Sequence, residues 1–221
     1  MSDLDFEKYK NDGWGLSVDG FKELYEIISN HPKKELQVLE FGSGTSTRFL
    51  VDVATTITTK TINIESYDNS EYWCYKPDRH YDFLDLKIRR LLQCNDASFA
   101  KMFVEKKYLP ELMEYRLSPP HTRQKNCFYE ILPNDLQKKE YDIIILDGPN
   151  GNGRSIAFLH LQHMLQPGCY IYVDDYDHHP YPQCLKYIFE TEVHKHRKVG
   201  VAPGDGDAYI IYKILSSKVQ K

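Results

Sequence analysis

Apolar side chains recur along the first segment of the chain with the period of a helix. Between residues 17 and 30 they have the i, i+3, i+4, i+7 spacing of one helix face, at Phe21, Leu24, Tyr25 and Ile28. Ser17 or Asp19 is placed to cap the start of this helix, and His31 followed by Pro32 ends it. The pattern therefore predicts a helix over 17–30.

Short apolar runs alternate with further helical segments in the rest of the chain. Strands are predicted at 37–41, 61–67, 141–146, 169–173, 197–201 and 208–214, and helices after Gly44 and at 154–165 and 183–192. The run at 141–146 is continuously apolar, as in strands that are covered on both faces in parallel sheets. This alternation predicts an α/β fold with a doubly wound, mostly parallel sheet and an antiparallel hairpin at its C-terminal edge.

The stretch from Asp68 to Tyr141 is longer than one helix, one strand and one helix need. The apolar residues of 83–92 predict a helix, and 114–117 is the candidate for the third strand. We interpret residues 74–135 as an insertion within a single domain, 1–221. Its segment 118–125 is either a solvated loop or a lid over an acceptor.

Composition excludes several classes of protein. The chain has 221 residues, with 32 acidic and 28 basic side chains and a net charge of −4, which argues against nucleic-acid binding. No apolar run is long enough to cross a membrane, and the first residues lack the layout of a secretory signal. Five cysteines without a C-x-x-C pair favour neither disulfides nor zinc, so a cytoplasmic location is expected.

The first predicted strand ends in a glycine-containing turn, which we call the glycine turn (residues 40–47). Glycines let a backbone pass close to a ligand, and ligands of open α/β sheets bind at the carboxyl ends of the strands. The turn has Thr47 where a dinucleotide-binding G-x-G-x-x-G motif requires glycine, and it lacks the lysine of a Walker A loop. A purely structural turn is the alternative.

An acid near the end of the second predicted strand is placed to accept hydrogen bonds from a ribose. Glu65 and Asp68 are both candidates. Asp68 is preferred because it lies at the strand end, whereas Glu65 lies within the strand. An exposed turn acid with no ligand is the alternative.

At this point the chain resembles the class I S-adenosylmethionine-dependent methyltransferases. The matching pieces are residues 38–47, the acid after the second strand, 141–149 and 207–212, and the resemblance spans about 37–214. It implies a Rossmann-like fold that binds S-adenosylmethionine. The implied cofactor-binding residues are Glu40, Gly42, Ser43, Gly44, Thr45 and Asp68. The adenine contact has no assigned residue, and Asp96 is a poor candidate because no clear strand precedes it.

Three acids follow two neighbouring predicted strands: Asp147, Asp174 and Asp175, here called the strand-end acids. Converging like charges require a compensating cation or proton, and oxygen ligands with open positions suit Mg²⁺. The arrangement resembles the metal-dependent O-methyltransferases of the catechol and macrolide-sugar types, in which Mg²⁺ binds a substrate diol. The sequence Asp147, Gly148, Pro149 also resembles glucuronoxylan 4-O-methyltransferases, which points to a sugar hydroxyl. Turn closure or helix capping by these acids is the alternative.

The candidate catalytic residues are His178 and Asp147. In the metal-dependent family a lysine or histidine follows the fourth-strand acid by three residues, but Asn150 stands there in this chain. His178 and His179 follow Asp175 closely, and a histidine beside carboxylates can act as a base. His178 is preferred. His160 and His163 are interpreted as packing or surface residues.

Aromatic and basic residues near the predicted cleft are candidates for acceptor binding. Three tyrosines could stack on a sugar or an aromatic ring, although core packing explains tyrosines equally well: Tyr172, Tyr176 and Tyr181. A basic cluster could hold an acidic acceptor or form a solvated face: Arg116, His121, Arg123 and Lys125.

The sequence as a whole predicts an S-adenosylmethionine-dependent, Mg²⁺-assisted O-methyltransferase. Its partner would be a small-molecule or glycan acceptor, without nucleic acid or membrane, and an oligomer is possible. An aminopropyltransferase-like enzyme and a non-catalytic nucleoside-binding module are the alternatives, because one fold hosts many functions.

Overall fold

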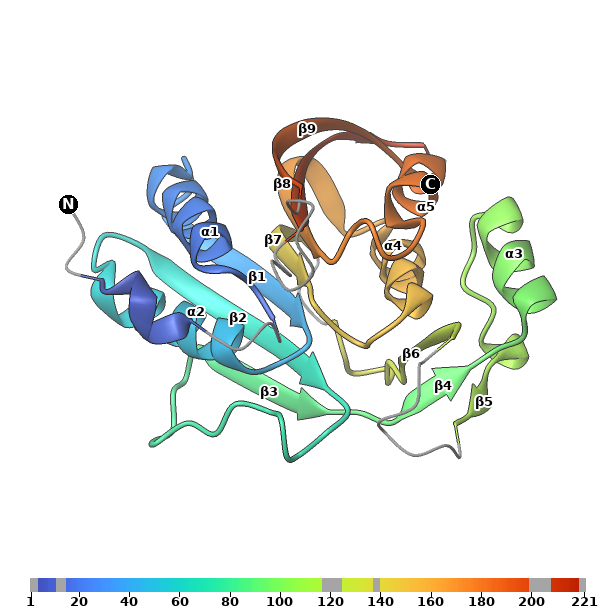
Figure 1. The fold of residues 1–221 in the computed structure, drawn as a ribbon, viewed down its shortest axis with the longest axis horizontal. Coiled ribbons are helices and arrows are strands. Elements are labelled where there is room, and N and C mark those ends of the chain that lie inside the picture. The colour runs from blue at the N-terminus through green and yellow to red at the C-terminus, as the bar shows by residue number, and fades with distance from the viewer. Residues whose placement is uncertain (1–3, 11–14, 117–124, 137–139, 199–207, 219–221) are drawn as a thin grey trace.

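The chain is built around a seven-stranded sheet with the strand order β3-β2-β1-β7-β8-β10-β9. A computed structural model describes residues 4–10, 15–116, 125–136, 140–198 and 208–218 (Figure 1). The strands of this sheet are β1 (Glu35–Phe41), β2 (Thr61–Asp68), β3 (Leu84–Ile88), β7 (Tyr141–Leu146), β8 (Leu165–Asp174), β9 (Phe189–Arg197) and β10 (Tyr209–Ser217).

Five of these strands run parallel, and the last two form an antiparallel hairpin. β1 is the middle one of the five parallel strands, with β2 on one side and β7 on the other. β7 pairs with β8 in parallel, whereas β10 is antiparallel to both β8 and β9. The predicted doubly wound, mostly parallel sheet with a C-terminal hairpin is confirmed.

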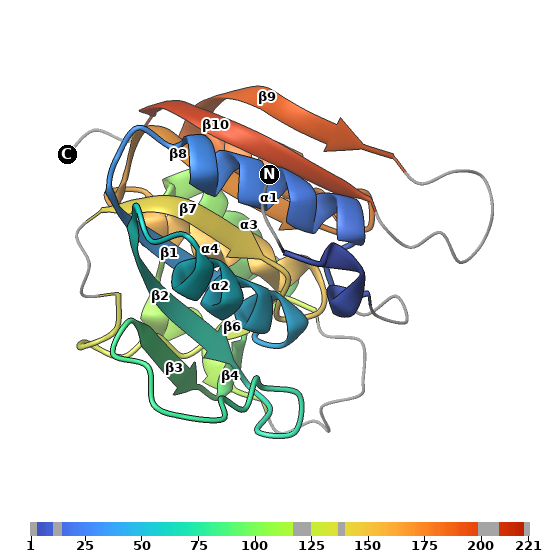
Figure 2. The same ribbon diagram turned by 90° about the vertical axis from the view of Figure 1, so that its left-hand side faces the viewer.

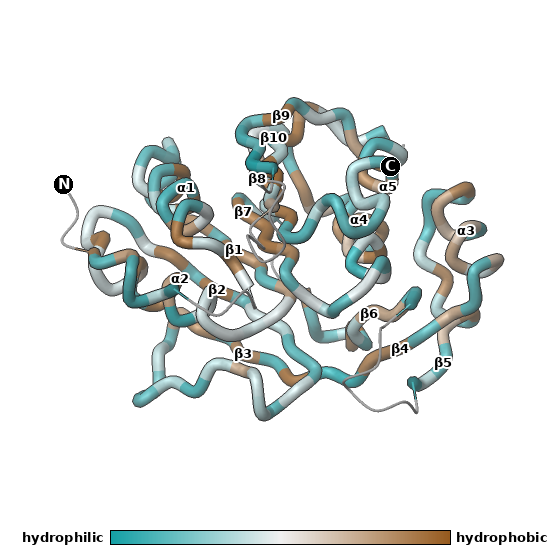
Figure 3. The backbone as a smooth tube through the Cα atoms, in the orientation of Figure 1, coloured by the Kyte–Doolittle hydropathy of each residue, from teal (hydrophilic) through white to brown (hydrophobic). Residues whose placement is uncertain are grey.

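Helices cover both faces of the sheet (Figure 2). The first face carries η1 (Phe6–Tyr9), α1 (Val18–Asn30) and α2 (Thr45–Thr56), and the second carries α3 (Asp96–Glu105), α4 (Ile156–Leu161) and α5 (Tyr181–Ile188). Apolar strand residues lie between these layers, as the brown segments of the backbone tube show (Figure 3). Two buried clusters, one on each face, therefore form the core.

The first helix begins as its sequence predicts. Ser17 is the N-cap, and its hydroxyl accepts a hydrogen bond from the Gly20 N–H at 3.1 Å. Phe21, Leu24 and Ile28 are fully buried against the sheet. No helix in the described part of the chain is long and apolar enough to cross a membrane.

The segment 83–92 is not the predicted helix. It forms β3, the third strand of the sheet, and then β4 (Leu91–Gln93). Residues 114–117 are therefore not the third strand. Only β5 (Glu114–Tyr115) forms there, and residue 117 lies outside the described residues.

Three other predicted boundaries shift. The predicted helix 154–165 consists of η3 (Asn152–Ser155) and the short α4, and β8 already begins at Leu165. The predicted helix 183–192 ends at Ile188, where β9 begins. The strand predicted at 197–201 shares only Arg197 with β9, and part of it lies outside the described residues.

A second, small antiparallel sheet lies within the predicted insertion, with the order β5-β4-β6. β6 (Cys127–Tyr129) follows α3 and η2 (Pro110–Leu112). Phe128 and Tyr129 are buried in the same cluster as Phe41 and Tyr67 of the main sheet. Although α3 and β4 lie to one side in Figure 1, the small sheet packs on the core of the main one.

Candidate functional site

The glycine turn follows β1 and lies against the end of β7. Gly42 has φ of +99°, which favours glycine, and a Cβ there would lie 2.6 Å from the Gly148 nitrogen. The Phe41 carbonyl accepts hydrogen bonds from the N–H groups of Asp147, at 2.9 Å, and Gly148, at 2.6 Å. The backbone thus fixes the glycine turn directly to the first of the strand-end acids.

Asp68 ties the end of β2 to the same turn. Its Oδ2 accepts a hydrogen bond from the Ser43 N–H at 2.9 Å, and its Oδ1 accepts one from the Ser70 N–H at 2.7 Å. Burial raises the pKa of Asp68, while these two N–H groups act in the opposite direction. Two residues that the sequence assigned to one cofactor site, Ser43 and Asp68, are therefore in contact.

Glu40 is completely buried at the base of the turn. Its Oε2 accepts hydrogen bonds from the hydroxyls of Thr47 and Ser66, each at 2.5 Å, while its Oε1 is buried with no hydrogen-bond partner in the described part of the chain. Burial raises the pKa of this carboxyl to about 7, against the effect of the neighbouring hydroxyls. A buried oxygen without a hydrogen-bond partner is expensive, which agrees with the raised pKa of this carboxyl.

Open space adjoins the turn at Gly44. A Cβ at this position would meet only the Trp73 carbonyl, at 3.7 Å. Thr45 is the first residue of α2, whose N-terminal N–H groups favour negative charge. The loop after β2 is held over the turn by a hydrogen bond from the Tyr75 N–H to the Ser43 hydroxyl, at 3.2 Å.

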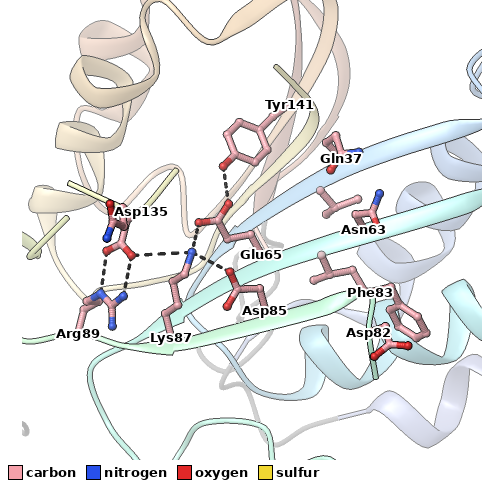
Figure 4. A pocket seen from close by; sticks show the side chains of 13 residues that line it. Gln37, Asn63, Glu65, Asp82, Phe83, Asp85, Lys87, Arg89, Asp135 and Tyr141 are labelled. Atoms are coloured by element: carbon pink, nitrogen blue, oxygen red, sulfur yellow. Dashed lines mark hydrogen bonds and ion pairs between the residues drawn. The ribbon is translucent and has the colours of Figure 1, made fainter. Parts of the chain in front are cut away.

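Glu65 lies away from the turn, in a buried ionic network (Figure 4). It accepts hydrogen bonds from Lys87 and from the hydroxyls of Tyr67 and Tyr141, both at 2.5 Å. Although burial acts to raise its pKa, these donors lower it. The network lines a pocket of about 450 Å³ that opens on β1, β2 and β3. Of the two candidate acids, only Asp68 contacts the glycine turn.

The strand-end acids come together at the ends of β7 and β8. Asp147 follows β7, Asp174 is the last residue of β8, and Asp175 has φ of +50° in the left-handed region. The side chain of Asp174 is buried, while those of Asp147 and Asp175 are 17% and 33% exposed. Left-handed backbone in a non-glycine residue is concentrated at functional sites, and here it occurs beside two converging carboxylates.

A guanidinium accompanies these acids. Arg154 Nη2 lies 3.8 Å from Asp147 Oδ1 and 3.6 Å from Asp175 Oδ2. Burial raises the pKa of Asp147 against the lowering effect of Arg154, and burial together with Asp147 and Asp175 raises the pKa of Asp174 well above its ordinary value.

The predicted Mg²⁺ site at Asp147, Asp174 and Asp175 stays a prediction. The described residues include no group of three or more His, Cys, Asp or Glu side chains with the arrangement to hold a metal ion. The positive charge beside the acids belongs to Arg154, which the sequence analysis missed. Its signal was a lone arginine that opens the apolar segment 154–165, seven residues after Asp147.

The histidines lie as follows. His178 Nδ1 is 3.7 Å from Asp175 Oδ1, and the side chain is 63% exposed, so His178 adjoins the strand-end acids. His179 packs edge-on against the ring of Tyr181. His160 is half-buried between the rings of Tyr108 and Phe128, and desolvation lowers its pKa to about 4, in agreement with the predicted packing role.

The three candidate tyrosines separate. Tyr172 is buried in the α1-side core, stacked on Tyr209, so it does not line the acid cluster as predicted. Tyr181 is buried beside Arg154, and its hydroxyl donates to the Gly151 carbonyl at 2.7 Å. Tyr176 forms a hydrogen bond with His196.

The basic cluster is only partly described. Lys125 forms an ion pair with Asp96 at 2.6 Å, and Arg116 lies near the Cys127 sulfur at 3.5 Å. His121 and Arg123 lie outside the described residues. The proposal of an acidic acceptor remains a prediction.

No protein-family model and no curated protein matches this chain. Solved structures give weak similarities of backbone arrangement. The citrinin polyketide synthase CMeT domain is 12% identical with a TM-score of 0.46, over 90% of this chain and 53% of that one. A putative class I S-adenosylmethionine-dependent methyltransferase from Listeria monocytogenes is 9% identical with a TM-score of 0.48, over 96% and 64%.

A putative caffeoyl-CoA O-methyltransferase from Staphylococcus aureus is 10% identical with a TM-score of 0.44, over 91% of this chain and 85% of that one. The chain thus spans about half of the length of the first of these proteins and less than two thirds of the second. These similarities concern the backbone alone.

Proposed function

We propose that this chain is an S-adenosylmethionine-dependent methyltransferase that acts on a hydroxyl of a small molecule or a sugar. The observation that carries the proposal is the junction of the glycine turn with Asp68 on one side and Asp147 on the other. Asp68, an open turn and a set of carboxylates thus lie at one end of the sheet, where ligands of such folds bind, and this supports a role for Asp68 in ribose binding.

The residues of the turn fit the cofactor. Asp68 would hold the ribose, and the open backbone at Gly44 would hold the amino-acid part, with Glu40 supporting the turn from below. Ser43 and Thr45 would complete the contacts from the turn and the start of α2. When bound, the cofactor supplies a methyl group on a sulfonium, which transfers to a nucleophile in one displacement.

The acid cluster would bind the acceptor. Asp147, which is partly exposed, would accept a hydrogen bond from a second hydroxyl of the acceptor and so orient the reacting oxygen toward the methyl group. His178 would take the proton of the reacting hydroxyl, with Asp175 orienting the imidazole. Arg154 among these acids opposes the binding of a cationic polyamine, so methyl transfer is preferred to aminopropyl transfer.

The first test is thermal unfolding with S-adenosylmethionine, with its demethylated product and with NAD. At 100 times its dissociation constant a ligand stabilises by about 2.7 kcal/mol, which is roughly 5–10 °C for a chain of this size. We expect a shift with the two sulfur ligands and none with NAD. Asp68→Asn should weaken the shift because it removes a carboxylate from the ribose site.

Asp85→Asn is the matched control, because Asp85 is a mostly exposed acid on β3 outside the glycine turn. Its ligand-induced shift should equal that of the wild type. No shift with either sulfur ligand would contradict the proposed function and favour a nucleoside-binding module with another ligand.

A further inference from the structure

Arg154 is a buried cation fixed by the backbone at the ends of β7 and β8. Its Nε donates to the Pro149 carbonyl at 2.9 Å, and its Nη1 donates to the Asp174 carbonyl at 3.1 Å. The side chain is only 5% exposed, and the ring of Tyr181 lies 5.9 Å from its guanidinium carbon. Two carbonyls and an aromatic face thus hold the guanidinium in one orientation.

The remaining nitrogen, Nη2, faces the acids. It lies 3.8 Å from Asp147 Oδ1 and 3.6 Å from Asp175 Oδ2, within ion-pair range but beyond hydrogen-bond length. The positive charge therefore attracts both carboxylates, but Nη2 forms no hydrogen bond with these two oxygens. Because Arg154 is buried and both acids are partly exposed, the carboxylates remain accessible from the solvent side.

A divalent cation would compete with this guanidinium. Mg²⁺ binds carboxylate oxygens at about 2.0–2.1 Å, so a metal shared by Asp147 and Asp175 would lie within a few ångströms of a fixed positive charge. Arginine keeps its charge in proteins, and its backbone hydrogen bonds oppose its withdrawal.

We propose that Arg154 takes the place of a divalent cation at the strand-end acids and is the positioning residue that holds Asp147 and Asp175 for the acceptor. The positioning of an acceptor rests on the proposed function, whereas the substitution of guanidinium for metal does not. The site then takes a neutral hydroxyl compound by hydrogen bonds to carboxylates whose repulsion the arginine offsets.

The test is a titration of the protein with Mn²⁺, followed by electron paramagnetic resonance in the absence of any cofactor. We expect no saturable binding by the wild type or by Arg154→Lys, which keeps the charge. Arg154→Met keeps the bulk and removes the charge, so it should bind Mn²⁺ saturably, with a dissociation constant at least tenfold below the highest Mn²⁺ concentration at which the wild type shows no binding. That gain should disappear in Arg154→Met combined with Asp175→Asn.

Saturable Mn²⁺ binding by the wild type that is lost in Asp175→Asn would overturn the inference, and so would a folded Arg154→Met variant without the gain. If Arg154→Met does not fold, the triple variant with Asp147→Asn and Asp175→Asn decides. Recovery of its folding would support charge balance as the role of Arg154, and continued unfolding would overturn it. Failure of the proposed function would appear separately, as absence of a shift with the sulfur ligands.

Discussion

At the scale of single residues, the site depends on carboxyl groups whose surroundings differ sharply. Glu40 is buried beneath the glycine turn, and one of its oxygens has no hydrogen-bond partner among the described residues, whereas Asp68 accepts hydrogen bonds from two backbone N–H groups. Asp147 and Asp175 face a guanidinium. These differences arise from partners that the folded backbone brings to each acid, some near in the sequence and some distant. The sequence therefore predicted the acids but not their states.

Glu40→Gln should stabilise the protein without ligand at alkaline pH. Because the pKa of Glu40 is about 7 in the folded chain and near 4.5 in the unfolded one, folding favours the protonated form. The free energy of unfolding should therefore fall as pH rises from about 4.5 to 7. The variant lacks this loss. Its free energy of unfolding should therefore exceed that of the wild type by about 1–3 kcal/mol at pH 8 and should differ little at pH 4.5.

Urea unfolding of wild type and variant at both pH values checks this expectation. Glu35→Gln, on an exposed residue of the same strand, is the control and should leave the pH dependence unchanged. Equal stabilities of Glu40→Gln and wild type at pH 8 would show that the buried carboxyl carries no penalty.

The insertion is where sequence and structure diverge most at the scale of elements. Residues 141–146 were predictable because a strand buried on both faces has a continuous apolar run. The segment 83–92 was mispredicted because the spacing of its apolar residues fits both the helical and the strand period. Leu84, Leu86 and Ile88 alternate as in a strand, and pairing with β2 decides the outcome.

The ionic network of Figure 4 contributes to holding β3 at the edge of the main sheet. Lys87, which is 12% exposed, pairs with Glu65 and with Asp85. Arg89 donates to Asp135 from Nε at 2.7 Å and from Nη2 at 2.6 Å. These contacts join β2 and β3 to the segment that leads back from the insertion to β7.

Lys87→Met should destabilise the protein by about 3 kcal/mol, because it leaves buried carboxylates without their cation. Lys101→Met removes an exposed ion pair on α3 and should cost at most about 0.5 kcal/mol. Urea unfolding at pH 7 measures both. The deficit of Lys87→Met should shrink as pH falls, because the lowered pKa of Glu65 stabilises the fold only above its unfolded value.

The two sheets share one hydrophobic core at the scale of the whole molecule. Phe128 of β6 is fully buried, with its ring centroid 5.0 Å from that of Phe41 in β1 and 5.6 Å from that of His160 in α4. The small sheet therefore packs on the core of the main sheet, and the insertion over 74–135 stays a prediction.

Phe128→Ala should lower the free energy of global unfolding by about 3–5 kcal/mol, the usual cost of deleting a buried aromatic ring. Hydrogen exchange monitored by mass spectrometry should show the loss equally in peptides from β4 and from β7. A loss confined to the insertion would instead identify it as a separately unfolding unit.

The glycine turn and the strand-end acids could be predicted from the sequence, but the position of Arg154 beside those acids could not. Asp68 and Ser43 meet because both lie where parallel strands end, which a strand pattern reveals. Arg154 reaches Asp147 and Asp175 only through the turn after β7 and the short helix η3, whose path depends on tertiary packing.

The contact between Gly42 and Gly148 has a consequence for how such a site can diversify. Main-chain hydrogen bonds to the Phe41 carbonyl, rather than side chains, set the spacing between the glycine turn and the first acid. The alignment of a methyl donor with its acceptor would thus depend on the backbone rather than on particular side chains. Substitutions of the surrounding side chains could then change which acceptor binds, while the main chain keeps the distance between the methyl donor and the acceptor the same.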